Sequence, residues 1–219
     1  MPVKIGVVSQ KGGVGKSTLC RLIAREYAAA DWNVKIADMD IKQSTSFNWN
    51  ARRMEHGIQP DIAVEQFGRM SQALRIQDSY DLLVFDGAPH STAMTLEIAK
   101  EVDLVILTTS TPVDDLEPTL RLAYELKQND IPREKMAVAL CRVGESDREL
   151  EDAREYIKLT GYYLLPVEIQ ERTAYKQASD EGKALSETPF KTLNDKAQQF
   201  AEQIEARIEQ LTNKAKAYR

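Results

Sequence analysis

The chain has 219 residues, 42% of them apolar and 29% charged, and its formal net charge is −5 at pH 7. The length and apolar content predict a single α/β domain over residues 1–219, and the acidic balance argues against a surface that is basic throughout. No apolar run approaches the length of a membrane span, and the start MPVKIGVVSQ does not have the pattern of a secretory signal. Cys20 and Cys141 fit no metal-ligand spacing, so we expect free thiols in a reducing cytosol.

The predicted elements alternate between apolar strands and helices with an apolar side. In chain order they are a strand over 3–9, a helix over 17–30, strands over 33–40, 80–89 and 102–110, a helix over 115–130, a strand over 135–143, a helix over 146–161, a strand over 161–169 and a helix over about 190–213. Pro118 would lie in the first turn of its helix, where proline is tolerated. The alternation predicts a mostly parallel, twisted sheet with helices on both faces.

A glycine-rich segment, SQKGGVGKST at 9–18, joins the first strand to the first helix. It departs from the usual G-x-x-x-x-G-K-[ST] phosphate-binding pattern because Gln10 replaces the first glycine and Lys11 follows it. The glycines let consecutive N–H groups face one anion, Lys16 can reach the β- and γ-phosphates, and the Ser17 hydroxyl can ligate Mg²⁺. The predicted nucleotide-binding residues of this loop are Gly12, Gly13, Val14, Gly15, Lys16, Ser17 and Thr18.

Acidic residues end the two strands that should lie beside this loop. Asp86 follows the apolar run LLVF, and Asp38 and Asp40 end the strand over 33–40. Carboxylates at these strand ends can hold a magnesium ion and its waters beside a phosphate-binding loop. We predict that Asp40 positions the attacking water and that Ser17, Asp40 and Asp86 form the metal site. Asp38 could serve either purpose or fix the loop.

The segment KGGVGKST resembles the deviant Walker A motif, K-G-G-x-G-K-[ST], of the ParA/MinD family of ATPases. The resemblance covers nearly the whole chain: VKIADMDIKQS is similar to the Walker A′ strand of the family, and YDLLVFDGAP is similar to its Walker B strand. The segment VEIQERTAYKQASDEGKAL resembles a late segment that usually contains I-x-x-R and A-x-x-x-G. The short ParF-like plasmid partition proteins are the most similar group, because they share D-G-A after Walker B and an N-W pair, here Asn48-Trp49.

The resemblance implies a P-loop ATPase that uses ATP and Mg²⁺ and forms a nucleotide-sandwich homodimer. In such a dimer Lys11 would reach the ATP of the partner, so the catalytic residues would be Lys11, Lys16 and Asp40. A cation at the γ-phosphoryl group stabilises the charge that builds up there during transfer. The implied partners are non-specific duplex DNA and a ParB-like or centromere-binding adaptor protein. The implied location is the cytoplasm of a bacterium, on the nucleoid, with no membrane association.

The chain departs from the family pattern in three places. The Walker A′ motif lacks its usual proline after Asp40, and Walker B is followed by Gly87-Ala88-Pro89-His90 in place of T-P-P. Many relatives also carry an asparagine that contacts adenine where this chain has Cys141-Arg142. Base recognition is therefore predicted to rest on the backbone around Pro166–Ile169 or on stacking by Arg142, and the sequence itself does not exclude GTP.

Two surfaces near the C-terminus bear on the choice of partner. Basic residues in the last part of the chain are the predicted carriers of DNA binding: Arg172, Lys176, Lys191, Lys214 and Lys216. The last helix has an apolar stripe of Phe200, Ile204, Ile208 and Leu211 beside Glu202, Glu205 and Glu209. Because an anionic membrane would repel the glutamates, we expect this stripe to dock on the sheet. The alternatives are a MinD-like membrane ATPase and an ATPase that positions a protein cargo.

Overall fold

The computed structural model describes residues 2–90 and 92–217, with side chains as far as Asn213 at the C-terminal end. Its centre is an eight-stranded sheet in the order β3-β2-β4-β1-β5-β6-β7, with β8 paired to β6. All of the paired strands run parallel. The strands are β1 (Val3–Val8), β2 (Val34–Asp38), β3 (Ala63–Gln66), β4 (Leu82–Asp86), β5 (Leu104–Thr109), β6 (Met136–Val143), β7 (Tyr163–Leu164) and β8 (Ile169–Gln170).

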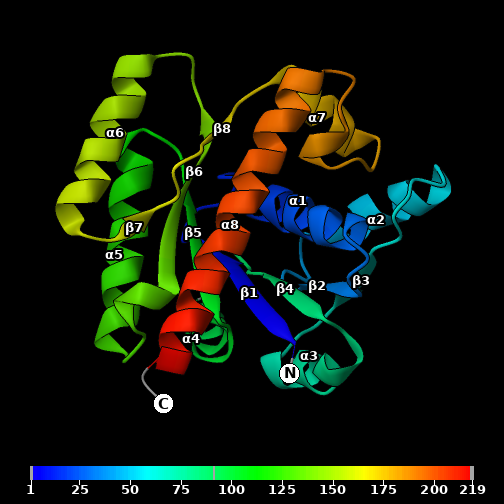
Figure 1. Cartoon of the computed structure of the whole chain (residues 1–219), viewed down its shortest axis with the longest axis horizontal. Helices are drawn as coiled ribbons and strands as arrows, with labels where there is room; N and C mark the ends of the chain where they lie inside the picture. The colour runs from blue at the N-terminus through cyan, green and yellow to red at the C-terminus, as the bar shows by residue number, and fades with distance from the viewer. Residues whose placement is uncertain (1, 91, 218–219) are drawn as a thin grey trace.

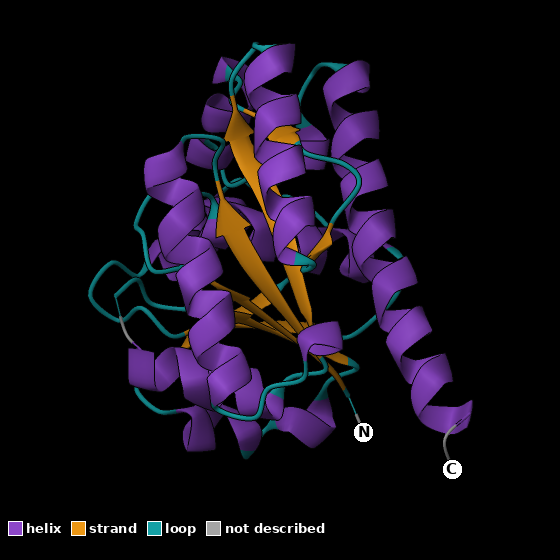
Figure 2. Ribbon diagram, turned by 90° about the vertical axis from the view of Figure 1, so that its left-hand side faces the viewer, coloured by secondary structure: helices purple, strands orange, loops and turns teal. Residues whose placement is uncertain are grey.

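Helices cover both faces of the sheet, each over its own apolar core (Figures 1 and 2). One face carries α1 (Lys16–Ala29), α2 (Thr45–Glu55), α7 (Thr173–Asp180) and α8 (Lys191–Ala217), together with the short 3₁₀ helix η3 (Leu185–Glu187). The other face carries α3 (Met70–Leu74), α4 (Thr92–Glu101), α5 (Val113–Gln128) and α6 (Asp147–Thr160). This arrangement confirms the predicted parallel α/β fold with helices on both faces.

The structure corrects the predicted elements in three respects. The segment predicted as one strand over 161–169 forms two short strands, β7 and β8, with 165–168 connecting them. The helix predicted over 115–130 begins at Val113, so Pro118 lies in its second turn. The prediction also missed β3, α2, α3, α4 and α7.

The last helix, α8, docks on the sheet as expected. Phe200 and Ile204 are fully buried and Ile208 is 8% exposed, all within the core that α8 shares with α1 and the strands. Leu211 is half-buried against the same core. In the described part of the chain, no helix combines the length and apolarity needed to cross a membrane.

The strand register sets up the functional site. Val7 of β1 pairs with Asp86 of β4, and Asp86 pairs with Asp38 of β2. Because all three strands are parallel, the loop after β1 and both carboxylates emerge at the same edge of the sheet.

Candidate functional site

The glycine-rich loop turns tightly between β1 and α1. Gly13 and Gly15 have φ angles of 79° and 97°, a region that residues with a side chain rarely adopt. A Cβ atom on Gly15 would also lie 3.2 Å from Cβ of Cys141 on β6. Glycine at position 15 therefore meets two requirements, the left-handed backbone and the close approach of a neighbouring strand.

Lys16 is held against this loop. Its side chain is largely buried, with the residue only 7% exposed, and its Nζ donates a hydrogen bond of 2.9 Å to the carbonyl of Lys11. Burial lowers the pKa of Lys16, while the nearby Asp86 and Asp40 act in the opposite direction. A loop-anchored ammonium at the start of a helix is suited to bind an anion.

Asp38 and Asp86 are buried side by side. Asp38 accepts hydrogen bonds from the backbone N–H groups of Asp40, Ser46 and Phe47, each at 3.1 Å, and so fixes the start of α2. Burial, together with the adjacent Asp86, raises the pKa of Asp38 to about 6. Of the roles left open by the sequence, the hydrogen bonds of Asp38 favour the fixing of the loop.

Asp86 is 1% exposed and accepts a 2.7 Å hydrogen bond from Oγ of Ser46. Burial raises the pKa of Asp86, although hydrogen bonds from Ser46 and Ser17 counteract this. Ser17, the predicted magnesium ligand, lies near this carboxylate. The hydrogen bond from Ser46 joins the end of the Walker B strand to α2.

Asp40 differs from both of these acids because it is only half-buried. One carboxylate oxygen accepts a 3.2 Å hydrogen bond from the N–H of Gln43, and the backbone carbonyl accepts one of 2.8 Å from Ser44. The chain after Asp40 therefore forms a compact turn, although it lacks the proline that usually follows this acid in the Walker A′ motif. Asp40 remains the predicted water-positioning acid, since its side chain reaches the neighbourhood of Lys16.

The oxygen donors at this edge fit a magnesium ion that also binds phosphate. Ser17, Asp40 and Asp86 offer a hydroxyl and two carboxylates, and Mg²⁺ takes only one or two such protein ligands when phosphates supply the others. In the described residues, no group of three or more His, Cys, Asp or Glu side chains could hold a metal ion on its own. The site is thus suited to a magnesium nucleotide, in which the phosphates complete the coordination.

Lys11 takes a different position from Lys16. Its Nζ lies 2.5 Å from a carboxylate oxygen of Asp115 in the first turn of α5, and 38% of its side chain is exposed. Although burial acts to raise the pKa of Asp115, hydrogen bonds from Lys11 and Ser110 hold it below its ordinary value. The two lysines of the loop therefore have different partners. Lys16 contacts the backbone of its own loop, and Lys11 contacts a carboxylate of α5.

A cavity of about 350 Å³ opens beside the P-loop. It is lined by the loop, the end of β6, β8 and α7, with Gly13, Gly15, Lys16, Ser17, Thr18, Arg142 and Ile169 among the predicted residues. Gly12 and Val14 do not line the cavity. Gly12 is exposed to solvent, and Val14 is buried in the protein. Pro166 also lies outside the cavity lining, and its carbonyl accepts a 3.0 Å hydrogen bond from Arg154 of α6. Pro166 lies where the chain crosses from β7 to β8, and its part in base recognition stays a prediction.

Arg142 lines the cavity and is held by hydrogen bonds to the P-loop and to Glu171. The β6–β8 register shifts between Cys141 and Val143, and Arg142 has a φ of 56°, which is uncommon for a non-glycine residue. Its guanidinium donates hydrogen bonds to the carbonyl of Gly13 and, at 3.1 Å, to Glu171. Arg142 therefore braces the P-loop in this structure, and stacking on a base would require it to leave these partners.

Two parts of the cavity were not predicted from the sequence: the wall formed by α7, and Arg21 of α1, which contacts that wall. Tyr175, Ser179 and Asp180 line the cavity, and Arg21, which is 7% exposed, donates a 2.9 Å hydrogen bond to Oγ of Ser179. The late A-x-x-x-G segment was the one sequence signal for this wall. Arg21 lies within an ordinary amphipathic helix pattern, which gives no sign of its role.

The three predicted DNA-binding residues whose side chains are described each pair with an acidic residue of the same chain. Arg172 pairs with Glu145 at 2.5 Å, Lys176 with Glu171 at 2.7 Å and Lys191 with Asp195 at 2.8 Å. The side chains of Lys214 and Lys216 lie outside the described residues. The backbone of α8 carries these two positions to the end of the helix away from α7 (Figure 1). DNA binding by this set stays a prediction.

A model of the CobQ/CobB/MinD/ParA nucleotide-binding domain family matches residues 5–185. The match includes the P-loop, all three acids and every residue that lines the cavity. The chain belongs to this family. As a member of the CobQ/CobB/MinD/ParA family, it is a nucleotide-binding protein.

The similar proteins carry names that refer to different processes. The maintenance of carboxysome distribution protein A of Gloeobacter kilaueensis is 33% identical over 115 residues, which are 52% of each chain, so the match spans about half of that relative. The septum site-determining protein MinD of Pyrococcus horikoshii, complexed with Mg-ADP, has a TM-score of 0.73 at 17% identity and covers 93% of this chain and 96% of its own. A Borrelia burgdorferi protein assigned to plasmid partition, bound to AMPPNP, has a TM-score of 0.72 at 16% identity, with 94% and 100% covered. At these identities the two structures show the shared fold alone.

Proposed function

We propose that this protein is a ParA-type ATPase that partitions a plasmid or chromosome in the bacterial cytoplasm. With ATP and Mg²⁺ it forms a sandwich homodimer that binds duplex DNA of the nucleoid without sequence preference. A ParB-like or centromere-binding adaptor protein then stimulates hydrolysis, and the dimer dissociates from the DNA. Membership in the CobQ/CobB/MinD/ParA family supports the nucleotide binding on which this cycle depends.

The observation that carries the proposal is that the two lysines of the loop, Lys16 and Lys11, have different contacts and different exposure. Lys16 is buried on its own loop, where it can serve the phosphates of its own subunit. Lys11 points away from that position, to Asp115 at the outer side of the loop, and keeps 38% of its side chain exposed. A lysine in this place can exchange its carboxylate partner for the phosphate of a facing subunit.

The remaining groups fit a hydrolytic site. Bound Mg²⁺ would neutralise charge on the phosphates, and Ser17 with Asp86 would hold it. Asp40 is the acid that can accept a hydrogen bond from the attacking water, because Asp38 is committed to the start of α2. We infer that the reaction is hydrolysis of ATP to ADP and phosphate.

A protein cargo is the second candidate. The relative with 33% identity over half of its length is named for carboxysome distribution, so the cargo of this chain could be a protein assembly in place of DNA. A MinD-like membrane role has less support, because the apolar side chains of α8 up to Ile208 are buried within the protein. The adaptor encoded beside this protein distinguishes the first two candidates.

Sedimentation with nucleotide and DNA tests the proposal. The protein should sediment as a monomer with ADP, as a dimer with a non-hydrolysable ATP analogue, and with plasmid DNA only in the second state. Log affinity for DNA should fall linearly with log salt, by about 0.9 for each phosphate contact. Equal DNA binding with ADP, or binding that is insensitive to salt, would contradict the DNA-linked cycle. A nucleotide-dependent dimer that ignores DNA would favour the protein cargo.

A further inference from the structure

The first residue of α2, Thr45, lies against the predicted magnesium ligand. Its Oγ1 is 2.8 Å from Oγ of Ser17, and both residues line the 350 Å³ cavity beside the P-loop. Thr45 belongs to none of the motifs recognised in the sequence. It is nevertheless the side chain that joins α2 to the hydroxyl of the loop.

The position of Thr45 is fixed by its neighbours along the chain. The N–H groups of Ser46 and Phe47 donate to Asp38, and the hydroxyl of Ser46 donates to Asp86. On the other side, Ser44 adopts a φ of 53°, and its Oγ donates a 2.9 Å hydrogen bond to the carbonyl of Ile41. A backbone with this many restraints on both sides of Thr45 places its hydroxyl in a defined direction.

The hydroxyl of Ser17 can accept a proton from Thr45 while it also binds a metal ion. A serine hydroxyl has one proton and two lone pairs. Oγ of Ser17 and Oγ1 of Thr45 share one hydrogen bond, in which either hydroxyl can donate. Where Thr45 donates, Ser17 keeps its own proton for another acceptor. One lone pair is then available to a metal ion, and the other can accept the proton of Thr45. Ligands whose other contacts are fixed in this way bind metal more tightly than ligands that rotate.

We propose that Thr45 is a positioning residue of the magnesium site, whose hydroxyl donates to Ser17 and holds that ligand in its metal-binding orientation. The proposal rests on the proposed function, because it requires that a magnesium nucleotide binds beside Ser17. It adds a residue of α2 to a site that the motifs describe with the P-loop and two strand ends alone. Metal binding is thereby linked to the helix that Asp38 and Asp86 also hold.

The test is the affinity for ADP measured by titration calorimetry, once with Mg²⁺ and once with EDTA. ADP avoids both hydrolysis and ATP-dependent dimerisation. Thr45→Val keeps the shape of the side chain and removes the hydroxyl, so the gain in affinity from Mg²⁺ should fall by about tenfold or more. The affinity in EDTA should be unchanged. Thr45→Ser keeps the hydroxyl and should retain the gain within about twofold.

Thr192→Val serves as the matched control, since Thr192 is an exposed threonine in the first turn of α8. It should change neither affinity. A double variant, Ser17→Ala with Thr45→Val, should lose no more of the magnesium-dependent gain than Ser17→Ala alone, because Thr45 acts through Ser17. If Thr45→Val does not fold, Thr45→Ala compared with Thr45→Ser carries the same test.

The outcomes separate this inference from the proposed function. If Thr45→Val keeps the full gain, or weakens binding equally with Mg²⁺ and with EDTA, the positioning role is wrong while the nucleotide site stands. If the parent protein shows no gain from Mg²⁺ at all, the magnesium-dependent function fails and the inference fails with it. A loss confined to the Mg²⁺ titration, restored by Thr45→Ser, supports the role.

Discussion

Residues of one type take different roles at this site because their surroundings differ. Asp38, Asp40 and Asp86 lie within the same two motifs, yet Asp38 accepts three backbone hydrogen bonds and Asp40 stays half-buried. The same is true of the two lysines, since Lys16 binds a carbonyl of its own loop and Lys11 binds Asp115. The motif supplies the residue types, and local hydrogen bonding decides which of them is available for chemistry.

The first prediction concerns the ion pair that holds Lys11 within its own subunit. If Lys11 must leave Asp115 to reach the nucleotide of a partner, Asp115→Asn should strengthen the dimer formed with an ATP analogue. A partly exposed pair of this kind contributes up to about 1 kcal/mol. Each symmetric dimer releases two such pairs, so the dimer dissociation constant should fall by up to about 30-fold. Analytical ultracentrifugation measures it.

The exposed residue Asp114, one position earlier in α5, gives the control for this ion pair. Asp114→Asn removes a charge from the same helix turn without touching the Lys11 pair, and should leave the dimer unchanged. A weaker dimer with Asp115→Asn would mean that the pair is part of the dimer itself, contrary to this reasoning.

The motif-bearing residues of the site could be predicted from the sequence, and the supporting residues could not. P-loop, Walker A′ and Walker B residues follow from spacing and from the strands that precede them. Arg21, Thr45 and Ser46 act through contacts with segments far away in the chain, as Arg21 does with Ser179. Such contacts depend on where α2 and α7 pack, which a local pattern does not contain.

At the scale of whole elements, predictability follows burial. The strands β4 and β5 are buried along their entire length, so their apolar runs are continuous and were recognised. The edge strand β3 is only partly buried and contains Glu65, which obscures its pattern. The helix α2 was missed because it buries Arg53 beside Trp49, and an arginine at a core position breaks the expected apolar spacing.

An ion pair stabilises that buried arginine. Nη1 of Arg53 lies 2.7 Å from Oε2 of Glu187 in η3, and the two side chains are 1% and 11% exposed. The pair joins α2 to η3, whose first residue, Leu185, lines the cavity. Burial alone would raise the pKa of Glu187, but hydrogen bonds from Arg53 and the N–H of Ala184 outweigh it and hold the pKa below the ordinary 4.5.

The second prediction is that Glu187→Gln lowers the free energy of unfolding by about 3 kcal/mol at neutral pH, because it leaves Arg53 buried without its counter-charge. A carboxyl with a lowered pKa stabilises the fold above its unfolded value and loses this effect as the pH falls through the folded value. The difference between the variant and the parent should therefore be constant above about pH 5 and shrink below 4.5. Urea unfolding at several pH values measures it.

Glu181→Gln is the control for this pH dependence. Glu181 is exposed and pairs with Lys183 at 2.6 Å, so its loss should cost little at any pH. A destabilisation by Glu187→Gln that stays the same below pH 4.5 would contradict the assignment of the effect to charge.

The third prediction concerns Pro118 in the second turn of α5. Proline has no N–H, so at this position it removes a hydrogen bond that the helix could otherwise form to the carbonyl of Asp114. Pro118→Ala should raise the free energy of unfolding by about 1–3 kcal/mol. Thermal unfolding against Glu117→Ala, an exposed neighbour, measures the change, and an unchanged midpoint would contradict it.

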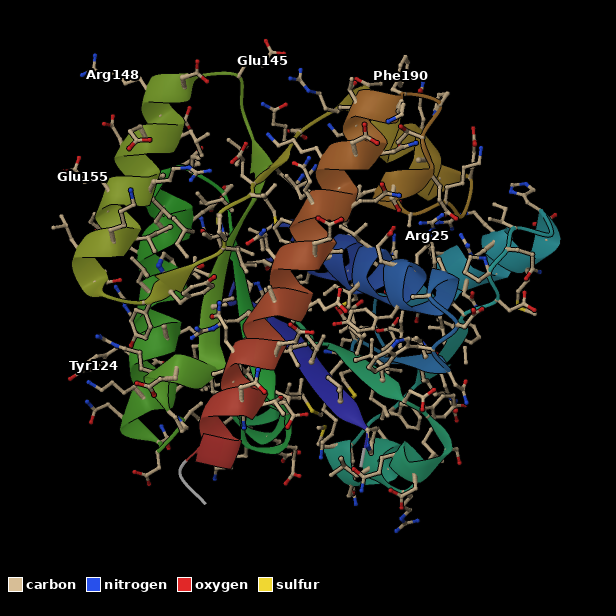
Figure 3. All side chains as sticks on the ribbon, in the orientation of Figure 1. Arg25, Tyr124, Glu145, Arg148, Glu155 and Phe190 are labelled. Atoms are coloured by element: carbon tan, nitrogen blue, oxygen red, sulfur yellow. The ribbon has the colours of Figure 1, made fainter. Side chains whose placement is uncertain are left out.

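At the scale of the whole molecule, the P-loop and the two carboxylate-bearing strand ends lie at one edge of the sheet, and Lys11 of the loop keeps 38% of its side chain exposed. In Figure 3 the labelled side chains of the upper region are Glu145 just before α6, Arg148 in its first turn and Phe190 just before α8. The cavity is lined by residues from Gly13 to Leu185, which lie far apart in the chain. The proposal that hydrolysis needs a second subunit can be tested by combining defective subunits.

The fourth prediction is that two inactive variants, Lys11→Ala and Asp40→Ala, regain ATPase activity when mixed. In the mixed dimer, one site has the P-loop and Asp40 of the first variant and receives Lys11 from the second. That site contains every predicted catalytic group. Up to about half of the parental activity per heterodimer should return, and a steady-state phosphate-release assay measures it.

The control for mixing is a double variant that carries both substitutions. Combined with Lys11→Ala, it forms dimers without any Lys11, so activity should stay absent. If the mixture of single variants also stays inactive while heterodimers are demonstrably present, Lys11 does not act across the interface in this protein.

The burial of Trp49 gives the molecule an optical label for α2. The guanidinium groups of Arg21 and Arg53 each lie 5.5 Å from the centroid of its ring, and Trp49 is 0% exposed, whereas Trp32 is 37% exposed. Aqueous quenchers such as iodide should therefore extinguish the emission of Trp32 and spare that of Trp49. Any displacement of α2 that opens the space around Trp49 would appear as a second quenchable population, so the native fluorescence of the protein can follow this helix without an added dye.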